Sequence, residues 1–403
     1  MPIHEARTMP NKVNFAIVGC GNMGGAHLDN IMSGKISNAH VTAVCDVDEN
    51  ALARVQSKYA DIKCCRDYTD LAAYDGIDAV IVATPHYIHP EIASYFLQCG
   101  RHVLTEKPIG IMQSEIERLV RIAEKSDRKF AIMFNQRTNP LFMRAREIMQ
   151  SGEIGELKRV QWTVTNWYRT QSYYDSGGWR GTFRLEGGGV LTNQAPHQLD
   201  LLQWICGMPK AVTAFCTAGK YHNVTVEDDA TLYFEYDNGA VGLFVTTTGD
   251  ACGTNRLEIS CDKGKMVLED GVLKLYKHKV SEREFCFTEK NGFYQPPIDY
   301  SEYTAKESVE GHVAVLRNFC NAILCDEPLI ANGTEGANQA SITAAAYLSW
   351  FTGKRQTVPV DAQLYETELI KRYEDDDYIE NRLKNAAEKP KGENHSDRWQ
   401  VRW

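Results

Sequence analysis

The sequence predicts an α/β protein in which a parallel sheet is followed by a mostly antiparallel sheet. Three observations support this fold class. Strand-like and helix-like segments alternate over residues 13–134, strand-like runs joined by short turns dominate residues 157–276, and a glycine-rich turn joins the first strand to the first helix. A chain of 403 residues suits about two domains, so we assign one sheet to each.

The first half alternates short apolar strands with amphipathic helices, which is the pattern of a parallel sheet covered on both faces. The expected strands are Val13–Val18, Val41–Cys45, Ala79–Ala83, His102–Thr105 and Phe130–Phe134. The expected helices between them include Glu49–Tyr59, Pro90–Cys99 and Ser114–Lys125.

The second half begins with a helix over Leu141–Met149 and continues with longer strands. These are Leu157–Thr165, Ala211–Thr217, Ala230–Tyr236, Ala240–Thr248, Arg256–Cys261, Lys265–Glu269 and Val272–Tyr276. Hairpin turns are expected at 237–239, 262–264 and 270–271, because each contains Asp followed by Gly within two residues. Helices are expected near 193–206 and over 307–324 and 334–351. We therefore expect domains at 1–135 and 136–365, followed by a polar tail at 366–403 that contains Trp399 and Trp403.

Composition excludes several classes of protein. The net charge of −9 leaves no basic surplus for general binding of nucleic acid. No apolar run is long enough for a membrane helix, and the N-terminus lacks the apolar core of a secretory signal. The twelve cysteines form no CxxC pair, so we expect reduced thiols. A cytoplasmic protein without a membrane or nucleic-acid partner is the expected class.

The segment Gly19-Cys20-Gly21-Asn22-Met23-Gly24 has the spacing of a dinucleotide-binding fingerprint, directly after a strand and opening a helix. Its glycines permit the tight turn, the approach of the pyrophosphate and the packing of helix against strand. Asp46 ends the second strand, where a carboxylate binds the ribose diol and repels a 2′-phosphate. We therefore predict a Rossmann domain that binds NAD rather than NADP.

Two further strand ends should line the cofactor. Thr84-Pro85-His86 and His89 follow the third expected strand, and Glu106-Lys107 follow the fourth. Lys107 lies at the carboxyl edge of the parallel sheet, so its ammonium is expected to point into the cofactor crevice. His86 and His89 lack a third ligand close by, and we expect no metal site.

The second informative segment is the run Gly187–Gly189 followed by Thr192, Asn193 and His197. If a helix begins near Thr192, Asn193 and His197 share one of its faces. The three glycines would permit close approach of the backbone to a ligand. A core histidine on a capped helix is the alternative.

Taken together, these motifs resemble the Gfo/Idh/MocA (glucose–fructose oxidoreductase, inositol dehydrogenase, rhizopine catabolism) family over about residues 13–360. The matching segments are GCGNMG, Asp46, Glu106-Lys107-Pro108, the block from Asn135-Gln136-Arg137 to Gly152-Glu153-Ile154-Gly155, and the glycine run with His197 and Asp200.

The resemblance implies a Rossmann domain, an α/β domain with an open sheet that pairs subunits into dimers or tetramers, and a site of lysine, aspartate and histidine. Glu106, Lys107 and Asn135 would contact the cofactor. Asn193 stands where the family has the aspartate, and an amide cannot act as the base. Lys107 and His197 are therefore the expected catalytic residues, with His197 as the base, and Asn193 is expected to bind substrate.

A wall for the substrate is expected from the segment 166–181, because aromatic rings stack on sugar rings while Arg and Asp bind hydroxyls. The candidates are Trp167, Tyr168, Arg169, Tyr173, Trp179 and Arg180. The alternatives are that the aromatic side chains pack the sheet and that Arg180 contacts the cofactor's diphosphate.

These expectations amount to an NAD-dependent oxidation of a secondary hydroxyl of a sugar or glycoside, with C3 of a glucoside as one candidate. The alternatives are an inositol or free-sugar dehydrogenase and a glycosidase that retains NAD and uses it transiently. A cofactor-binding regulator without turnover is a fourth hypothesis, which the intact Lys107 and His197 disfavour. The resemblance makes a homodimer or homotetramer the expected assembly.

Overall fold

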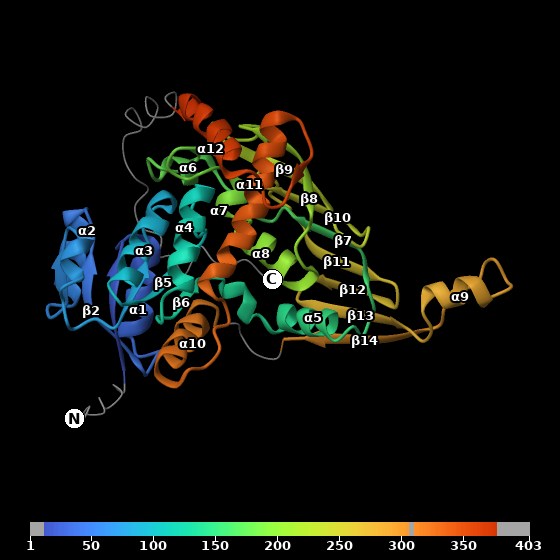
Figure 1. Ribbon diagram of the computed structural model, residues 1–403, viewed down its shortest axis with the longest axis horizontal. Coiled ribbons are helices and arrows are strands. Elements are labelled where there is room, and N and C mark those ends of the chain that lie inside the picture. Colours follow the sequence, from blue (N-terminus) through green and yellow to red (C-terminus); the bar gives the residue numbers. More distant parts are fainter. Residues whose placement is uncertain (1–11, 306–309, 377–403) are drawn as a thin grey trace. The chain divides into compact units, whose positions relative to one another are not determined.

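The computed structural model describes residues 12–305 and 310–376, and its chain forms two compact units (Figure 1). Within the described residues, unit 1 comprises 12–110, 115–135 and 310–336, and unit 2 comprises 111–114, 136–305 and 337–376. The described part of the chain contains no helix long and apolar enough to span a membrane. Each unit is built on one sheet.

Unit 1 contains a six-stranded sheet in which every pair of neighbouring strands is parallel, in the order β3-β2-β1-β4-β5-β6. This is the strand order of a Rossmann fold. The strands are β1 (Val13–Val18), β2 (Ala39–Cys45), β3 (Lys63–Cys65), β4 (Ala79–Val82), β5 (His102–Thr105) and β6 (Phe130–Ile132). The helices are α1 (Asn22–Met32), α2 (Glu49–Lys58), α3 (His89–Gln98) and α4 (Gln113–Glu124). The α/β prediction is confirmed.

Helix α10 (His312–Cys325) also belongs to unit 1. Its residues Val315, Leu316 and Phe319 are buried, and the Phe319 ring lies 6.1 Å from the ring of Phe15 in β1. The sequence-based boundaries placed this helix in the second domain. Its apolar face packs on the parallel sheet instead, so the chain returns to unit 1 after leaving it.

Unit 2 contains a nine-stranded mixed sheet in the order β14-β13-β12-β11-β7-β10-β9-β8-β15. All neighbouring pairs are antiparallel except β10 with β7. The strands are β7 (Leu157–Val164), β8 (Ala211–Ala218), β9 (Glu227–Glu235), β10 (Val241–Thr247), β11 (Asn255–Cys261), β12 (Gly264–Glu269), β13 (Val272–His278), β14 (Ile298–Thr304) and β15 (Gln356–Thr357). The three hairpin turns predicted from the sequence join β9 to β10, β11 to β12 and β12 to β13.

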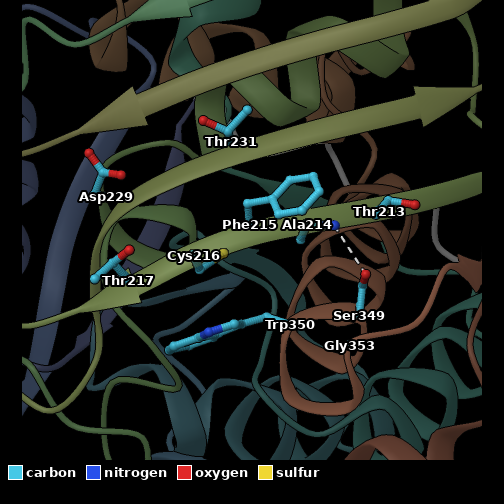
Figure 2. A pocket seen from close by; sticks show the side chains of 10 residues that line it. All are labelled: Thr213, Ala214, Phe215, Cys216, Thr217, Asp229, Thr231, Ser349, Trp350 and Gly353. Carbon is cyan, nitrogen blue, oxygen red and sulfur yellow. Dashed lines mark hydrogen bonds between the residues drawn. The ribbon is translucent and has the colours of Figure 1, made fainter.

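Helices cover one face of the unit 2 sheet. Side chains of α5 (Pro140–Gln150), α8 (Pro196–Cys206) and α11 (Gly336–Thr352) share one hydrophobic core with the inward residues of the strands. Phe215, Tyr233 and Leu243 point away from that core and are 68%, 40% and 37% exposed. At the β8 edge of this sheet, Phe215 and Trp350 line a hollow of 390 Å³ (Figure 2).

Some elements carry little sequence signal. β14 is exposed along most of its length, and no residue of α9 (Glu282–Thr288) is buried. The remaining short elements are α6 (Gln171–Asp175), α7 (Val190–Asn193), and the single turns Tyr68–Leu71, His86–Ile88, Asn135–Thr138 and Gly333–Glu335.

The expected polar tail begins with ordered structure. Helix α12 (Ala362–Lys371) buries Tyr365 and Leu369. Asp376 is buried and accepts hydrogen bonds from the backbone of Phe183 and Arg184. Trp399 and Trp403 lie outside the described residues.

Candidate active site

The glycine fingerprint folds as its spacing predicts. Gly19 has a φ of +95°, and a Cβ there would lie 2.5 Å from the carbonyl oxygen of Ala83. A Cβ at Gly24 would collide with the carbonyl oxygen of Gly19, while one at Gly21 would meet no other atom within 4 Å. Gly19 therefore allows the tight turn, and Gly24 allows α1 to pack closely against that turn. Gly21 leaves space beside the N-terminus of α1, where Asn22 and Met23 begin the helix. No side chain of the N-cap residue bonds the first turn of α1, so its amides suit a diphosphate.

Asp46 directly follows β2 and fixes this loop. Its Oδ2 accepts a hydrogen bond from the backbone N–H of Cys20 at 2.6 Å, and its Oδ1 accepts one from Asp48 at 2.8 Å. The carboxylate is therefore fixed next to the fingerprint at the carboxyl end of the strand. This is the position at which a ribose diol is bound in Rossmann domains, so the residues present fit NAD.

His89 corrects the expectation for the segment after β4. Its side chain is completely buried, with Nδ1 2.8 Å from the carbonyl oxygen of Pro108 and Nε2 2.8 Å from that of Thr84. Both ring nitrogens are thus occupied by the backbone, and His89 ties the two strand-end loops together instead of reaching a cofactor. Burial lowers its pKa, and the two carbonyl oxygens oppose that effect. Thr84, Pro85 and the largely buried His86 remain candidates for cofactor contact.

Lys107 follows β5 and stands next to a buried carboxylate. Glu106 is 6% exposed, and its Oε1 lies 2.7 Å from Nε2 of His27 in α1. Burial acts to raise the pKa of Glu106, but the hydrogen bond and charge of His27, with His312 and Lys107, outweigh it and lower that pKa to about 2. The pair connects the fingerprint helix to the Lys107 loop.

Asn135 is buried near the same cluster. Its Nδ2 lies 3.4 Å from Nδ1 of His312, and the His312 ring lies 5.8 Å from that of His27. Residues 27, 106, 135 and 312 thus form one polar cluster inside unit 1. Sequence reasoning missed His27 and His312, because neither belongs to a recognisable motif.

In unit 2, Asn193 and His197 lie on two helices rather than one. Helix α7 ends at Asn193, the chain turns through Gln194 and Ala195, and α8 starts at Pro196 with His197 as its second residue. The prediction that both share one helical face is therefore wrong. Pro196 was the available signal, because proline disfavours helical conformation in the residue before it.

Asn193 is oriented by a carboxylate that sequence reasoning missed. Its Nδ2 donates to Oε1 of Glu186, which is 2% exposed, and Oε2 of Glu186 accepts from the backbone N–H of Gly181. A carboxylate thus lies beside the position at which the family's aspartate is replaced by asparagine. His197 itself is 3% exposed.

The glycine run 187–189 approaches protein atoms. A Cβ at Gly188 would lie 1.9 Å from Oη of Tyr347, and one at Gly189 would lie 1.9 Å from the carbonyl oxygen of Glu227. A Cβ at Gly187 would press on Ile111. This corrects the expectation that these glycines make room for a ligand.

Arg137 and Asp200, which belong to two of the segments that resemble the family, form a buried ion pair. Nε and Nη2 of Arg137 donate to the two carboxylate oxygens of Asp200 at 2.8 and 2.6 Å, and both side chains are 1% exposed. Asp200 lies in α8, one turn after His197. The pair therefore anchors the helix that carries the candidate base.

The expected substrate wall divides into buried and accessible parts. Trp167 is 2% exposed and lies in the core of unit 2, whereas the neighbouring Tyr168 is 47% exposed. Arg180 lies over the rings of Tyr173 and Trp179, with its guanidinium carbon 4.4 and 4.5 Å from their centroids.

Tyr173 joins this wall to the turn between the two short helices. Its hydroxyl accepts hydrogen bonds from Nη1 of Arg180 and Nε2 of Gln194. The guanidinium of Arg169 lies 5.1 Å from the same ring centroid. A hydrogen bond thus joins the aromatic–arginine cluster to the turn that follows Asn193.

Family models match both parts of the chain. Residues 13–134 match the oxidoreductase family with an NAD-binding Rossmann fold, and residues 142–267 match the GFO/IDH/MocA C-terminal domain. Inositol 2-dehydrogenase of Rhizobium meliloti is 24% identical over 84% of this chain and 96% of that enzyme. The match to inositol 2-dehydrogenase of Corynebacterium glutamicum is 26% identical but spans only 49% of this chain and 56% of that enzyme.

Solved structures extend the likeness to the whole fold. The WlbA dehydrogenase of Bordetella pertussis, solved with NADH and UDP-GlcNAcA, is 25% identical with a TM-score of 0.72, and the match covers 87% of this chain and 100% of that one. The fingerprint geometry, the two sheets and the matches over both parts agree, and the chain belongs to the GFO/IDH/MocA family of NAD-binding oxidoreductases.

Proposed function

We propose that the protein is an NAD-dependent dehydrogenase that oxidises a secondary hydroxyl of a sugar or glycoside, with C3 of a glycoside as the preferred carbon. The observation that carries the proposal is the place of Lys107. It follows β5 at the carboxyl end of the parallel strands. The glycine loop follows β1, and Asp46 follows β2, at the same end of the sheet. A nucleotide-binding loop alone binds a cofactor, but an ammonium group at this edge serves a reacting oxygen.

The chemistry requires removal of a proton from the hydroxyl and of a hydride from its carbon. NAD, when bound, accepts the hydride. In our proposal His197 accepts the hydroxyl proton, because imidazole is the side chain suited to a base near neutral pH. Lys107 donates a hydrogen bond to the same oxygen and stabilises its developing charge. Asn193, held by Glu186, orients a neighbouring hydroxyl.

Two features support a substrate with a substituent at C1. The cluster of Arg169, Tyr173, Trp179 and Arg180 offers cationic and aromatic surfaces that exceed the needs of a bare polyol. WlbA, a structural neighbour, binds a UDP-linked sugar. Oxidation at C3 acidifies the hydrogen at C2, which allows the C1 substituent to leave by elimination.

The second candidate is oxidation of inositol or a free sugar, which the inositol 2-dehydrogenase relatives favour. A third is a glycosidase that retains NAD. An assay of the purified protein with a glucoside, a UDP-sugar, glucose and myo-inositol separates these candidates. Net NADH from the C1-substituted sugars supports the proposal, and net NADH from inositol or glucose alone supports the second. Release of the C1 group without net NADH supports the third, whereas NAD binding without turnover of any polyol favours a regulator.

The assignment of the base is tested by the variants Lys107→Met and His197→Ala. Each should lower kcat/KM for the sugar by about 10²- to 10⁴-fold, the usual contribution of a general acid or base. NAD should still bind, as a fluorescence titration with NADH would measure. Lys35→Met, on the exposed surface of unit 1, is the matched control. If His197→Ala kept near wild-type turnover while Lys107→Met abolished it, Lys107 would be the base.

We also propose a cytoplasmic homo-oligomer that assembles through the open face of the unit 2 sheet. The exposed Phe215, Tyr233 and Leu243 support the interface, because apolar residues on adjacent strands of one face mark association surfaces. The twelve unpaired thiols are in keeping with a reducing compartment. The remaining cofactor contacts, from Glu106 and Asn135, stay part of the proposal.

A further inference from the structure

A buried carboxyl group lies behind the helix that carries Asn193. Glu227 is the first residue of β9 and is completely buried. Its Oε2 accepts the backbone N–H of Gly189 at 2.9 Å, and its Oε1 accepts that of Leu191 at 2.9 Å. The hydroxyl of Tyr347, equally buried in α11, donates to Oε1 at 2.8 Å. Two observations indicate what this carboxyl group does: its hydrogen bonds, and the close fit of the glycine run 187–189 around it.

The contacts show that Glu227 caps a helix to which it does not belong. Helix α7 has only four residues, and its N-cap residue, Gly189, has no side chain to bond the first turn. The first N–H groups of a helix need an acceptor. Glu227 supplies it from β9, so the start of α7 is fixed by a strand of the sheet.

The glycine run shows that the fit is specific. Side chains at Gly188 and Gly189 would occupy the positions of Oη of Tyr347 and the backbone oxygen of Glu227. Tyr347 also lies 2.8 Å from Oγ1 of Thr192, which is the residue before Asn193. Gly188, Gly189 and Thr192 thus all fit closely against the Glu227–Tyr347 pair.

We infer that Glu227 is a positioning residue, which with Tyr347 fixes α7 and thereby sets the amide of Asn193 and the turn that leads to His197. The inference rests on the proposed function, because Asn193 and His197 are the groups proposed to act on the sugar. It adds a residue, remote in sequence, on which their geometry depends.

The contacts of Glu227 suit an ionised carboxylate, because all three of its partners donate hydrogen bonds to it. Burial raises the pKa of Glu227 to about 7, against the effect of its three hydrogen-bond donors. The titratable groups that interact with it are Tyr347 on α11, Tyr365 on α12 and Cys216 on β8. A glutamine fits the same volume but offers one oxygen, so its amide N–H₂ would face a backbone N–H.

The experiment compares Glu227→Gln with Glu227→Asp, Tyr347→Phe and the matched control Glu235→Gln at the other end of β9. Amide hydrogen exchange of the peptide 187–199 is measured without substrate, and KM and kcat are measured for the sugar. For Glu227→Gln we expect exchange to accelerate by at least about tenfold, the equivalent of one lost hydrogen bond of about 1.4 kcal/mol. We also expect the sugar KM to rise by a similar factor, while the affinity for NADH stays within twofold. Glu227→Asp and Tyr347→Phe should give smaller changes of the same kind.

Unchanged exchange in 187–199 for Glu227→Gln would overturn the inference, whatever the kinetics. So would a uniform loss of activity in proportion to the folded fraction, with the sugar KM unchanged. If Glu227→Gln does not fold, the same criteria apply to Tyr347→Phe, which keeps both bonds to the backbone. Failure of the proposed function can be distinguished from failure of this inference. In that case the wild type would oxidise no sugar, and amide hydrogen exchange of the peptide 187–199 would decide the role of Glu227.

Discussion

At the scale of single residues, the ionisation of Glu106 links the fingerprint helix to the candidate catalytic lysine. Its pKa of about 2 in the folded protein lies below the ordinary value of 4.5. Between these values the unfolded chain binds more protons, so stability is present above pH 4.5 and is lost as the pH falls towards 2. Glu106→Gln removes this dependence. We expect the wild type to lose about 1.5 kcal/mol of stability relative to the variant between pH 4.5 and pH 3.

Urea unfolding followed by circular dichroism at several pH values would measure this difference. The comparison must be made between the two proteins at each pH, because other carboxylates also titrate in this range. Parallel stability curves for wild type and variant would contradict a depressed pKa for Glu106. The matched control is Glu117→Gln, an exposed residue of α4.

Single residues were predictable where a short segment fixes their role. The fingerprint glycines and Asp46 were identified from their spacing, because the turn after β1 and the end of β2 lie at regular distances along the chain in a Rossmann fold. Glu227 and Tyr347 act on Gly189 from positions 38 and 158 residues away, and no local pattern marks them. His89 follows a strand end, as a cofactor-binding residue would, but both of its ring nitrogens contact backbone carbonyl oxygens. These contacts depend on the packing of two loops and cannot be predicted from a local pattern.

At the scale of elements, the ion pair between Arg137 and Asp200 anchors α8. Both side chains are buried, so removing one partner leaves an uncompensated charge. We expect Arg137→Met and Asp200→Leu each to destabilise unit 2 by about 3–5 kcal/mol, and the double variant to be less destabilised than their sum. Tryptophan fluorescence reports this unit, because the tryptophans of the described residues lie in it. Additive losses in the cycle would show that the pair contributes no coupling.

Elements with apolar periodicity were located from the sequence to within a few residues, and polar ones were not. β1 and β5 begin and end at the predicted residues because they are buried on both faces. β14 and α9 bury almost nothing and therefore have no periodic signal. The sequence also did not predict which unit contains α10, because an amphipathic pattern does not indicate against which sheet the apolar face packs.

At the scale of the whole molecule, two exposed apolar surfaces of unit 2 are candidates for the interface of the proposed homo-oligomer. One is the open sheet face with Phe215, Tyr233 and Leu243. The other is the excursion between β13 and β14, which extends beyond the sheet in Figure 1 and exposes Phe287 and Phe293 by 78% and 97%. The sheet face with these side chains spans the hydrogen-bonded strands β8, β9 and β10. A seven-residue helix without buried residues has little stability of its own and would pay an ordering cost on association.

We therefore expect the paired substitution Tyr233→Lys with Leu243→Lys to dissociate the proposed homo-oligomer into smaller species. These side chains lie opposite each other on β9 and β10, so the two new charges would face the partner together. Light scattering during size-exclusion chromatography measures the mass. Phe287→Ser with Phe293→Ser is the comparison variant, and it should leave the mass unchanged. If Phe287→Ser with Phe293→Ser lowers the mass while Tyr233→Lys with Leu243→Lys does not, the interface lies on the excursion. The exposed apolar side chains of the sheet face would then serve another partner.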